Sequence, residues 1–288
     1  MNYLRILRPI NLIIIGLTVL VLPLLTLLTV GVGWAAFFFI VLKALNLIII
    51  AAAGYVINDY FDQKAGAINK PDEQWVGTHI TGKRAILMHT LLSSLALIIS
   101  VFISHHFQHH FYWIATLVLT ILLLLYTPFF KRTMLMGNVL VAGVVAIIPW
   151  WALMDCINAT NERLIWAMVF FSFCSNWMRE VIKDIQDVEG DRVGQYKSIA
   201  LIMGVSKAVE LVKWSWIFLL ICVWLCHQFI LEESNRWSML LMLLPGLVGW
   251  FPVWIAKNPE DYKRIARLMK IWMIGATIGF ILLFAQCR

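Results

Sequence analysis

Long runs of apolar residues, separated by short polar segments, divide the chain and constrain its fold more than any other feature. A helix that crosses the hydrocarbon core of a bilayer needs about 20 mostly apolar residues. Nine runs reach or approach that length, so the sequence predicts nine transmembrane helices. They cover residues 10–30, 34–57, 85–104, 111–126, 137–154, 163–182, 208–230, 236–256 and 265–285.

The composition indicates that lipid is the solvent of most of the chain. The sequence is 61% hydrophobic and 14% charged, with a mean hydropathy of +0.83, whereas soluble domains carry about 25% charged residues. A soluble protein of this size could not bury so much apolar surface in one core. We therefore expect an all-α membrane protein with a single domain over residues 1–288.

The basic residues predict the orientation of the helices. Lys and Arg are concentrated before the first run and after the second, fourth, sixth and eighth runs, while the other side holds only Arg163, Arg236 and Arg288. Because cytoplasmic loops carry an excess of Lys and Arg, we expect the N-terminus and these four loops to be cytoplasmic. The net charge of +7 does not indicate nucleic-acid binding, because the basic residues form no single patch.

The first apolar run is too long for the core of a signal peptide, and it is interpreted as the first membrane span. No targeting segment is recognised in the sequence, so we expect a prokaryotic cytoplasmic membrane. A weak internal repeat is also present, because Asp59 follows Asn11 by 48 residues and Asp184 follows Asn138 by 46 residues. The spacing favours two four-helix repeats plus one helix, an arrangement that places a site at the repeat interface.

Acidic residues gather at the cytoplasmic end of the second predicted helix, in the segment Asn58-Asp59-Tyr60-Phe61-Asp62. On a helix, Asn58 and Asp62 are four residues apart, and Asp59 and Asp62 are three apart. Side chains at these spacings can share one face. The first acidic motif is therefore predicted to present Asn58, Asp59 and Asp62 together.

A second acidic motif follows the sixth predicted helix. Asp184, Asp187 and Asp191 have the spacing of one helical stripe, and Glu180 lies one turn deeper. Carboxylates at the C-terminal ends of helices oppose the helix dipole and repel one another. Mg²⁺, a hard cation that takes oxygen ligands and bridges carboxylates to phosphate oxygens, would offset both effects. The two motifs predict a metal–diphosphate site, and the alternative is a solvated acidic loop.

Basic residues on the same side of the membrane could hold a leaving diphosphate. The alternative explanation is positive-inside anchoring, which accounts for most of them. Lys131 is the favoured exception. Lys43 falls within the second predicted helix, where it either snorkels to the interface or faces the bundle interior. The basic residues on the acidic side include Lys70, Lys131, Arg132, Arg179, Arg192 and Lys197.

The pairing of Asn58-Asp59-x-x-Asp62 with Asp184-x-x-Asp187-x-x-x-Asp191 resembles the UbiA superfamily of intramembrane prenyltransferases. The resemblance implies a nine-helix bundle with a central cavity open to lipid. It also implies Mg²⁺-dependent transfer of a polyprenyl group from its diphosphate to a lipophilic acceptor. Further matching segments are Arg8-Pro9-x-Asn11, Ile68-Asn69-Lys70-Pro71, Tyr126 to Arg132, Gly137-Asn138, Arg179-Glu180 and Lys197-Ser198.

The resemblance implies roles for individual residues by motif position. The implied metal ligands are Asn58, Asp59, Asp62, Glu180, Asp184, Asp187 and Asp191. The implied catalytic residues are Asp62, Asp187, Lys131 and Tyr126. The implied substrate-binding residues are Asn11, Asn58, Lys131, Arg132, Asn138, Arg179 and Lys197.

Two positions depart from the family pattern. Gly66 stands where another Asp is common, and Glu73 stands where an Arg is common, which would weaken diphosphate binding or mark a branch with other substrates. The flanking segments look most similar to the branch that transfers geranylgeranyl to geranylgeranylglyceryl phosphate. The alternatives are an aromatic acceptor in quinone biosynthesis, a terpene cyclase, a transporter or a non-catalytic protein of the same fold. The oligomeric state stays open.

Overall fold

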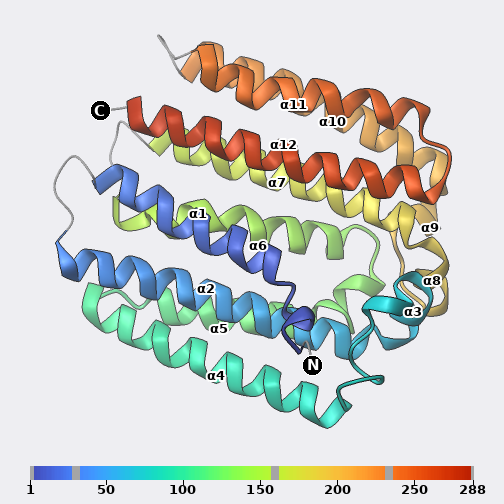
Figure 1. The fold of residues 1–288 in the computed structure, drawn as a ribbon, viewed down its shortest axis with the longest axis horizontal. Coiled ribbons are helices and arrows are strands. Elements are labelled where there is room, and N and C mark those ends of the chain that lie inside the picture. The colour runs from blue at the N-terminus through green and yellow to red at the C-terminus, as the bar shows by residue number, and fades with distance from the viewer. Residues whose placement is uncertain (1–2, 28–32, 157–161, 231–235, 287–288) are drawn as a thin grey trace.

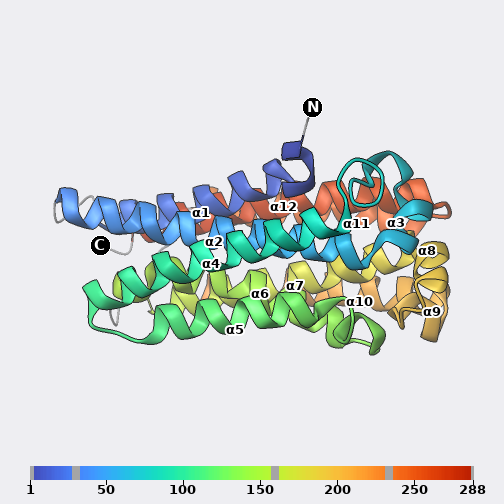
Figure 2. The same cartoon turned by 90° about the horizontal axis from the view of Figure 1, so that it is seen from below.

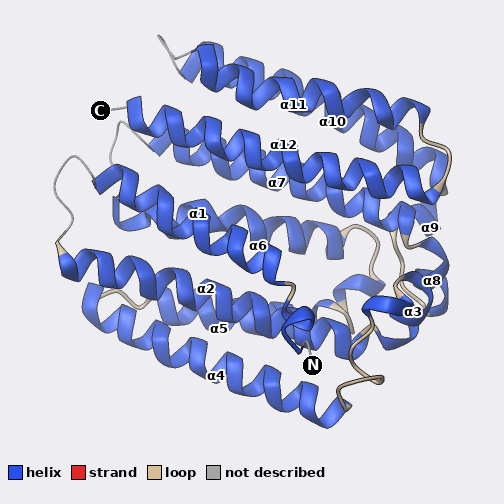
Figure 3. Cartoon of the chain, in the orientation of Figure 1, coloured by secondary structure: helices blue, strands red, loops and turns tan. Residues whose placement is uncertain are grey.

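The computed structural model describes residues 3–27, 33–156, 162–230 and 236–286. These residues form helices joined by short loops and contain no strand (Figure 3). The predicted all-α class is therefore confirmed for the described part of the chain.

Each of the nine predicted spans is covered over most of its length by one helix, and several helices extend beyond the predicted ends. Residues 28–30 of the first prediction lie outside the described part of the chain, and the predictions 137–154 and 236–256 end one residue beyond α6 and α11. These helices are α1 (Pro9–Leu27), α2 (Trp34–Phe61), α4 (Gly82–Phe107), α5 (Phe111–Tyr126), α6 (Met136–Leu153), α7 (Glu162–Gln186), α10 (Val205–Ile230), α11 (Arg236–Ile255) and α12 (Pro259–Gln286). The connecting segments contain the short helices η1 (Tyr3–Leu7), α3 (Gln63–Asn69), η2 (Pro71–Glu73), η3 (Phe130–Arg132), η4 (Met154–Cys156), α8 (Val188–Val193) and α9 (Ile199–Met203).

Six of the described helices, α2, α4, α6, α10, α11 and α12, are long and apolar enough to cross a membrane. The described parts of α1 and α5 are apolar but shorter. Helix α7 is long enough, but its last two turns carry Arg179, Glu180, Lys183 and Asp184. Nine membrane spans therefore stay a prediction, whereas the apolar, helical character of the chain is observed directly.

The long helices run side by side along one axis, and α3, α8 and α9 gather at the same end of the bundle in both views (Figures 1 and 2). Helix α3, which follows the first acidic motif, packs against α8, which carries Asp191 of the second. Segments more than 100 residues apart in sequence are thereby brought to one place.

The core on the C-terminal side is built around a stacked pair of indole rings. Trp216 of α10 and Trp272 of α12 lie 5.2 Å apart between ring centroids, with planes inclined by 19°. Their ring nitrogens donate to the backbone oxygens of Gly246 (2.9 Å) and Met242 (2.6 Å) of α11. A Cβ atom at Gly246 would overlap the Trp272 ring, so α11 approaches α12 closely only because this residue is glycine. The pair holds three helices together.

Lys43 of α2 faces the interior of the bundle, which is one of the two placements expected from the sequence. Its side chain is 4% exposed, and Nζ lies 2.7 Å from Oδ2 of Asp155 and 3.3 Å from the backbone oxygen of Ala152. The hydroxyl of Tyr112 donates to the same carboxylate. At about 1.5 Å per residue, Lys43 is about 24 Å along α2 from the first acidic motif, so this ion pair belongs to the opposite end of the bundle.

Candidate active site

Asp62 joins three separate segments at the end of α2. Its Oδ2 accepts hydrogen bonds from Nζ of Lys131 (2.8 Å) and Nδ2 of Asn58 (3.2 Å), and its Oδ1 accepts one from the hydroxyl of Tyr196 (2.6 Å). The side chain is 16% exposed. Hydrogen bonds to a charged group are among the strongest that side chains make. Asp62 is therefore held in one orientation by residues from α2, η3 and the loop after α8.

The amide of Asn58 is oriented by the segment after α5. The hydroxyl of Thr127 donates to Oδ1 of Asn58 (3.0 Å), which leaves the amide nitrogen directed at Asp62. Asn58 and Asp62 therefore share one face, as their spacing predicts.

Asp59 pairs with a residue that directly precedes α1. Its Oδ1 accepts a hydrogen bond from Nη2 of Arg8 (2.7 Å), and the guanidinium of Arg8 lies over the ring of Tyr55 at 4.9 Å from the centroid. Tyr55 also makes a side-chain hydrogen bond with Asn11. Asp59 also lies close enough to Asn58 for a side-chain hydrogen bond and close enough to Asp62 for electrostatic repulsion, so it stays near the other two residues of the motif while Arg8 pairs with it.

The second acidic motif is interrupted. Helix α7 ends at Gln186, Asp187 adopts φ −98° and ψ 11°, and α8 begins at Val188. The prediction of one unbroken helical stripe is therefore wrong. Because of the break, Asp184 and Asp191 turn toward different partners.

Asp184 joins α7 to α6 and α9. Its Oδ2 accepts hydrogen bonds from Nδ2 of Asn138 (2.9 Å) and from the backbone nitrogen of Ile199 (3.1 Å). Both Asn138 and Asp184 were predicted site residues, and the structure brings them into direct contact. The contact links the start of α6 to the end of α7, the two helices of the proposed second repeat.

Asp191 of α8 brings the second motif to the first. Burial raises the pKa of Asp191 to about 6, the Lys131 ammonium lowers it, and the carboxylates of Asp187 and Asp62 raise it. Burial lowers the pKa of Lys131, but Asp62, Asp191 and Asp187 outweigh it, so the pKa of Lys131 is raised overall. Carboxylates of both motifs therefore act on one another and on a single lysine.

Glu180 and Tyr126 are two further predicted site residues near the acidic cluster. Glu180 is engaged by two cations, Nη1 of Arg179 at 3.1 Å and Nζ of Lys183 at 2.8 Å. The phenol of Tyr126 lies within the electrostatic reach of Glu180, Asp62, Asp184 and Asp191. Tyr126 is thus central to the acidic cluster, whereas Glu180 already has its own cationic partners.

Two predicted residues, Arg132 and Lys197, lie at the edge of the acidic cluster. The side chains of Arg132 and Lys197 are exposed, and the backbone nitrogen of Lys197 donates to the backbone oxygen of Lys131 (3.2 Å). This bond links the loop after α8 to η3. Both residues are near the acidic cluster without pairing to it in the described structure.

Two positions depart from the family pattern, and the structure describes the surroundings of Gly66 but not those of the Glu73 side chain. Gly66 lies in α3, where an added Cβ would make an ordinary contact with Gln74 at 3.7 Å. The missing carboxylate at this position therefore reflects no steric demand for glycine. The side chain of Glu73 lies outside the described part of the structure.

Asn69 ties the two motifs together through the backbone. Its Nδ2 donates to the backbone oxygen of Asp187 (3.1 Å), and its Oδ1 accepts from the backbone nitrogen of Gly190 (3.0 Å). A Cβ at Gly190 would overlap the Asn69 amide. The glycine therefore permits the close approach of α3 and α8 that both hydrogen bonds need.

We expect Asn69→Ala to lower enzymatic turnover by about tenfold or more, because two backbone groups at the break in the second motif lose their partners. Steady-state diphosphate release measures the effect, and Gly190→Ala is expected to act in the same direction by forcing the same contact apart. Gln63→Ala, which removes a hydrogen bond to Tyr60 within the first motif's own turn, serves as the comparison. Full activity in both Asn69→Ala and Gly190→Ala would show that this joint is not needed.

The donor set suits a hard divalent cation. Within the described residues, no three Asp, Glu, His or Cys side chains converge as a ready metal cluster. The carboxylates of Asp62 and Asp187 nevertheless both repel that of Asp191, and Lys131 is attracted to all three. Carboxylate and amide oxygens are the ligands that Mg²⁺ prefers, and a cation there would relieve the repulsion.

Tyr196 and Thr127 were not among the residues singled out from the sequence. Tyr196 is 134 positions from Asp62, and Thr127 is 69 positions from Asn58. Tyr196 directly precedes the Lys197-Ser198 pair that was noted in the sequence, but the pattern does not say which way its ring points.

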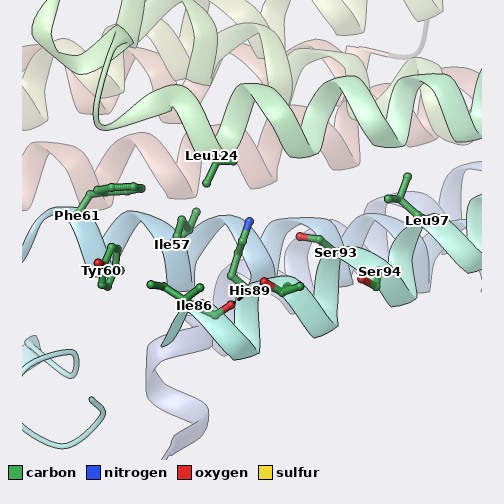
Figure 4. Close-up of a pocket in the computed structure, with 10 residues that line it drawn as sticks. Ile57, Tyr60, Phe61, Ile86, His89, Ser93, Ser94, Leu97 and Leu124 are labelled. Carbon is green, nitrogen blue, oxygen red and sulfur yellow. Dashed lines mark hydrogen bonds between the residues drawn. The ribbon is translucent and has the colours of Figure 1, made fainter. Parts of the chain in front are cut away.

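A separate groove lies on the other side of α2, between α4 and α5 (Figure 4). It has a volume of about 540 Å³ and is lined by apolar side chains together with His89 and Ser93. Tyr60 and Phe61 of the first acidic segment line it, but none of the predicted site residues does. The groove is therefore not lined by the acidic cluster.

Comparison with known proteins agrees with the motifs. The sequence profile of the UbiA prenyltransferase family matches residues 15–274. The chain belongs to the UbiA prenyltransferase family. It is thus an integral membrane protein and a prenyltransferase. A digeranylgeranylglyceryl phosphate synthase from Methanosphaera stadtmanae is 26% identical over 281 residues, which cover 96% of this chain and 97% of the relative.

Solved structures show that the fold is also that of this family. A structure from work on digeranylgeranylglyceryl phosphate synthase in membranes has a TM-score of 0.72 and 22% identity, covering 99% of this chain and 98% of its own. A UbiA homologue from Archaeoglobus fulgidus bound to GPP and Mg²⁺ has a TM-score of 0.64 and 15% identity, covering 97% and 99%.

Proposed function

We propose that this prenyltransferase transfers a geranylgeranyl group from geranylgeranyl diphosphate to geranylgeranylglyceryl phosphate. The observation that carries the proposal is the convergence of Asp62, Asp191 and Lys131 from three segments at one end of an apolar bundle. The choice of acceptor is supported by the relative from Methanosphaera stadtmanae, which matches nearly the full length of both chains.

Mg²⁺ is the proposed cofactor, as in the Archaeoglobus fulgidus homologue. Its ligands would come from Asn58, Asp59 and Asp62 on one side and Asp184, Asp187 and Asp191 on the other. When bound, the cation neutralises charge on the diphosphate leaving group. Glu180 is proposed to act indirectly, because Arg179 and Lys183 already occupy its carboxylate.

The residues of the chain itself hold and orient the reactants. Lys131 is placed to bind diphosphate oxygens as the bond between the allylic carbon and the diphosphate breaks. The acceptor's hydroxyl oxygen then forms a new bond to the allylic carbon, and its proton is taken up by the released diphosphate. Tyr196 and Asn58 keep Asp62 in position. The apolar helices around the site would exclude water from the allylic cation.

We further propose that residues 1–288 act as one membrane unit of nine spans, with a central cavity open to lipid. The end that carries α3, α8 and α9 would face the cytoplasm of a prokaryotic cell. Lys and Arg residues concentrate at that end in the sequence, as the positive-inside rule requires.

The test is diphosphate release from purified protein given geranylgeranyl diphosphate, with candidate acceptors added one at a time. We expect release that depends on geranylgeranylglyceryl phosphate and on Mg²⁺, and that falls to background when EDTA removes the metal. Mass spectrometry of the lipid product confirms which oxygen was alkylated.

Other outcomes would identify the alternatives. Release that depends on an aromatic acid would indicate the quinone branch, and a cyclised hydrocarbon without any acceptor would indicate a terpene cyclase. No release with any donor or acceptor would favour a non-catalytic member of the family.

A further inference from the structure

The groove between α2, α4 and α5 lies toward the end of the bundle that carries the acidic motifs (Figure 4). Tyr60 and Phe61 of the first acidic motif line one end of it, and the lining residues of α4 run from Ile86 to Leu97. That stretch of helix is about 16 Å long at 1.5 Å per residue, which is about half of the hydrocarbon core of a bilayer. The groove therefore has the length of a lipid chain segment within one leaflet.

The groove is open to the outer surface of the bundle. Phe61, Ile86 and Leu124 line it and are 38%, 43% and 36% exposed. In a membrane protein, exposed apolar side chains of this kind face lipid, so a ligand of the groove enters from the surrounding membrane. The volume of about 540 Å³ falls within the range of small-molecule sites, about 300–1,000 Å³.

Ser93 places a hydroxyl in the groove that has no partner. Ser93 is 7% exposed, and its Oγ atom is buried and makes no hydrogen bond in the described structure. Figure 4 shows this hydroxyl directed along the groove toward the ring of His89. Thr90 and Ser100 of the same helix instead donate to backbone oxygens of the preceding turn (3.0 and 2.8 Å). Ser93 therefore presents to the groove a hydrogen-bonding group that the helix does not satisfy.

His89 lies one helical turn from Ser93 and contributes an acceptor. It is 8% exposed, and its Nδ1 lies 3.0 Å from the backbone oxygen of Ala53 on α2. Because a carbonyl oxygen only accepts hydrogen bonds, Nδ1 carries the proton, and Nε2 of the neutral ring is an acceptor. Residues four apart on a helix share one face. The groove therefore offers a hydroxyl and an imidazole side by side.

The lining selects for an uncharged ligand. No Asp, Glu, Lys or Arg is among the described residues that line the groove. A charged headgroup there would leave water without a counter-ion, which is costly. An alcohol fits, because its hydroxyl can donate to Nε2 of His89 and accept from Oγ of Ser93. A hydrocarbon chain alone would leave both protein groups without a partner.

We propose that the groove binds a long-chain prenyl alcohol from the membrane, with the hydroxyl between Ser93 and His89. The apolar chain would lie along Ile57, Leu97 and Leu124, which line the groove. The choice of a prenyl chain rests on the proposed function, which supplies a geranylgeranyl donor.

The reaction beside the groove can supply this alcohol. When water rather than the acceptor attacks the allylic carbon of geranylgeranyl diphosphate, a new carbon–oxygen bond forms and the bond to the diphosphate breaks. The diphosphate leaves with the electron pair and takes up the proton that the water loses. The products are diphosphate and geranylgeraniol, and the neutral, apolar alcohol stays in the membrane around the protein.

The test measures equilibrium binding of tritium-labelled geranylgeraniol to the full-length protein in phosphatidylcholine nanodiscs, with empty nanodiscs as the background. We expect saturable binding that Ser93→Ala weakens by about three- to tenfold, the loss of one hydrogen bond. Ser100→Ala is the matched control, because it removes a buried hydroxyl of the same helix that does not line the groove. Thr90→Trp, which fills the groove from its exposed side, should abolish binding.

Competing ligands identify the site and the ligand class. Geranylgeranyl diphosphate in excess should leave the label in place, and full displacement would put the alcohol in the acidic cluster and overturn the inference. Phytane, an isoprenoid hydrocarbon without a hydroxyl, should compete poorly. Equal competition by phytane, or an unchanged affinity in Ser93→Ala, would show that no hydroxyl is recognised. Equal competition by oleyl alcohol would overturn the choice of a prenyl chain.

The proposed function fails in a different measurement. Its failure is an absence of acceptor-dependent diphosphate release, whereas the binding of geranylgeraniol is measured without any acceptor or turnover. Loss of one result therefore does not imply loss of the other.

Discussion

Replacement of Asp62 by asparagine is expected to lower the rate of diphosphate release by about 100- to 1000-fold, the range seen when one preorganised electrostatic contact is removed. Asn58, Lys131 and Tyr196 all donate hydrogen bonds to this carboxylate. The amide has nearly the same shape but no charge, and its nitrogen cannot accept from Lys131 or Tyr196. The change therefore removes a proposed metal ligand and leaves Lys131 with one carboxylate fewer.

The matched control is Glu210→Gln, which neutralises an acid that is 51% exposed and forms an ion pair with Lys213 on α10. Exposed pairs contribute little to stability, so this variant should keep wild-type activity. Thermal unfolding of both variants in detergent shows whether the fold is retained. If Asp62→Asn remained folded and released diphosphate at the wild-type rate, Asp62 would have no place in the reaction.

Replacement of Lys43 by methionine is expected to destabilise the protein by about 3 kcal/mol without a direct effect on the reacting groups. Removing one member of a buried ion pair typically costs about 3–5 kcal/mol, since the remaining charge keeps its desolvation penalty. The lower end applies because the Asp155 side chain is 25% exposed while Lys43 is 4% exposed. Thermal unfolding followed by tryptophan fluorescence measures the loss.

The double variant Lys43→Met/Asp155→Asn should recover a substantial part of that stability. The neutral amide can still accept a hydrogen bond from Tyr112, which donates to Asp155 in the wild type. A double-mutant cycle with the two single variants gives the coupling energy of the pair. Simple additivity of the two losses would mean that Lys43 and Asp155 do not stabilise each other.

The buried ion pair of Lys43 and the acidic residues of the first motif therefore lie on the same helix, α2, but in different parts of it. Lys43 and Asp59 are both part of α2, yet their partners come from unrelated segments: Asp155 in one case and Arg8 in the other. A substitution at Lys43 should therefore change stability more than KM, and a substitution at Asp62 should do the reverse.

The sequence by itself determined the helices and the end of the molecule that carries the chemistry. Apolar runs of span length specify helices wherever they occur, because a backbone in lipid must satisfy its own hydrogen bonds. Each of the nine runs is covered by one helix over most of its described length. The alternation of these helices then brings both acidic motifs to one end, where α3 packs on α8.

The partners of individual side chains were decided only by tertiary structure. Spacing on one helix correctly placed Asn58 beside Asp62, since that relation is local. It could not show that Asp59 would turn to Arg8, that α7 would break at Asp187, or that Tyr196 would reach Asp62 from 134 residues away. Such contacts depend on how helices rotate and slide against one another, and that is set by packing over the whole bundle.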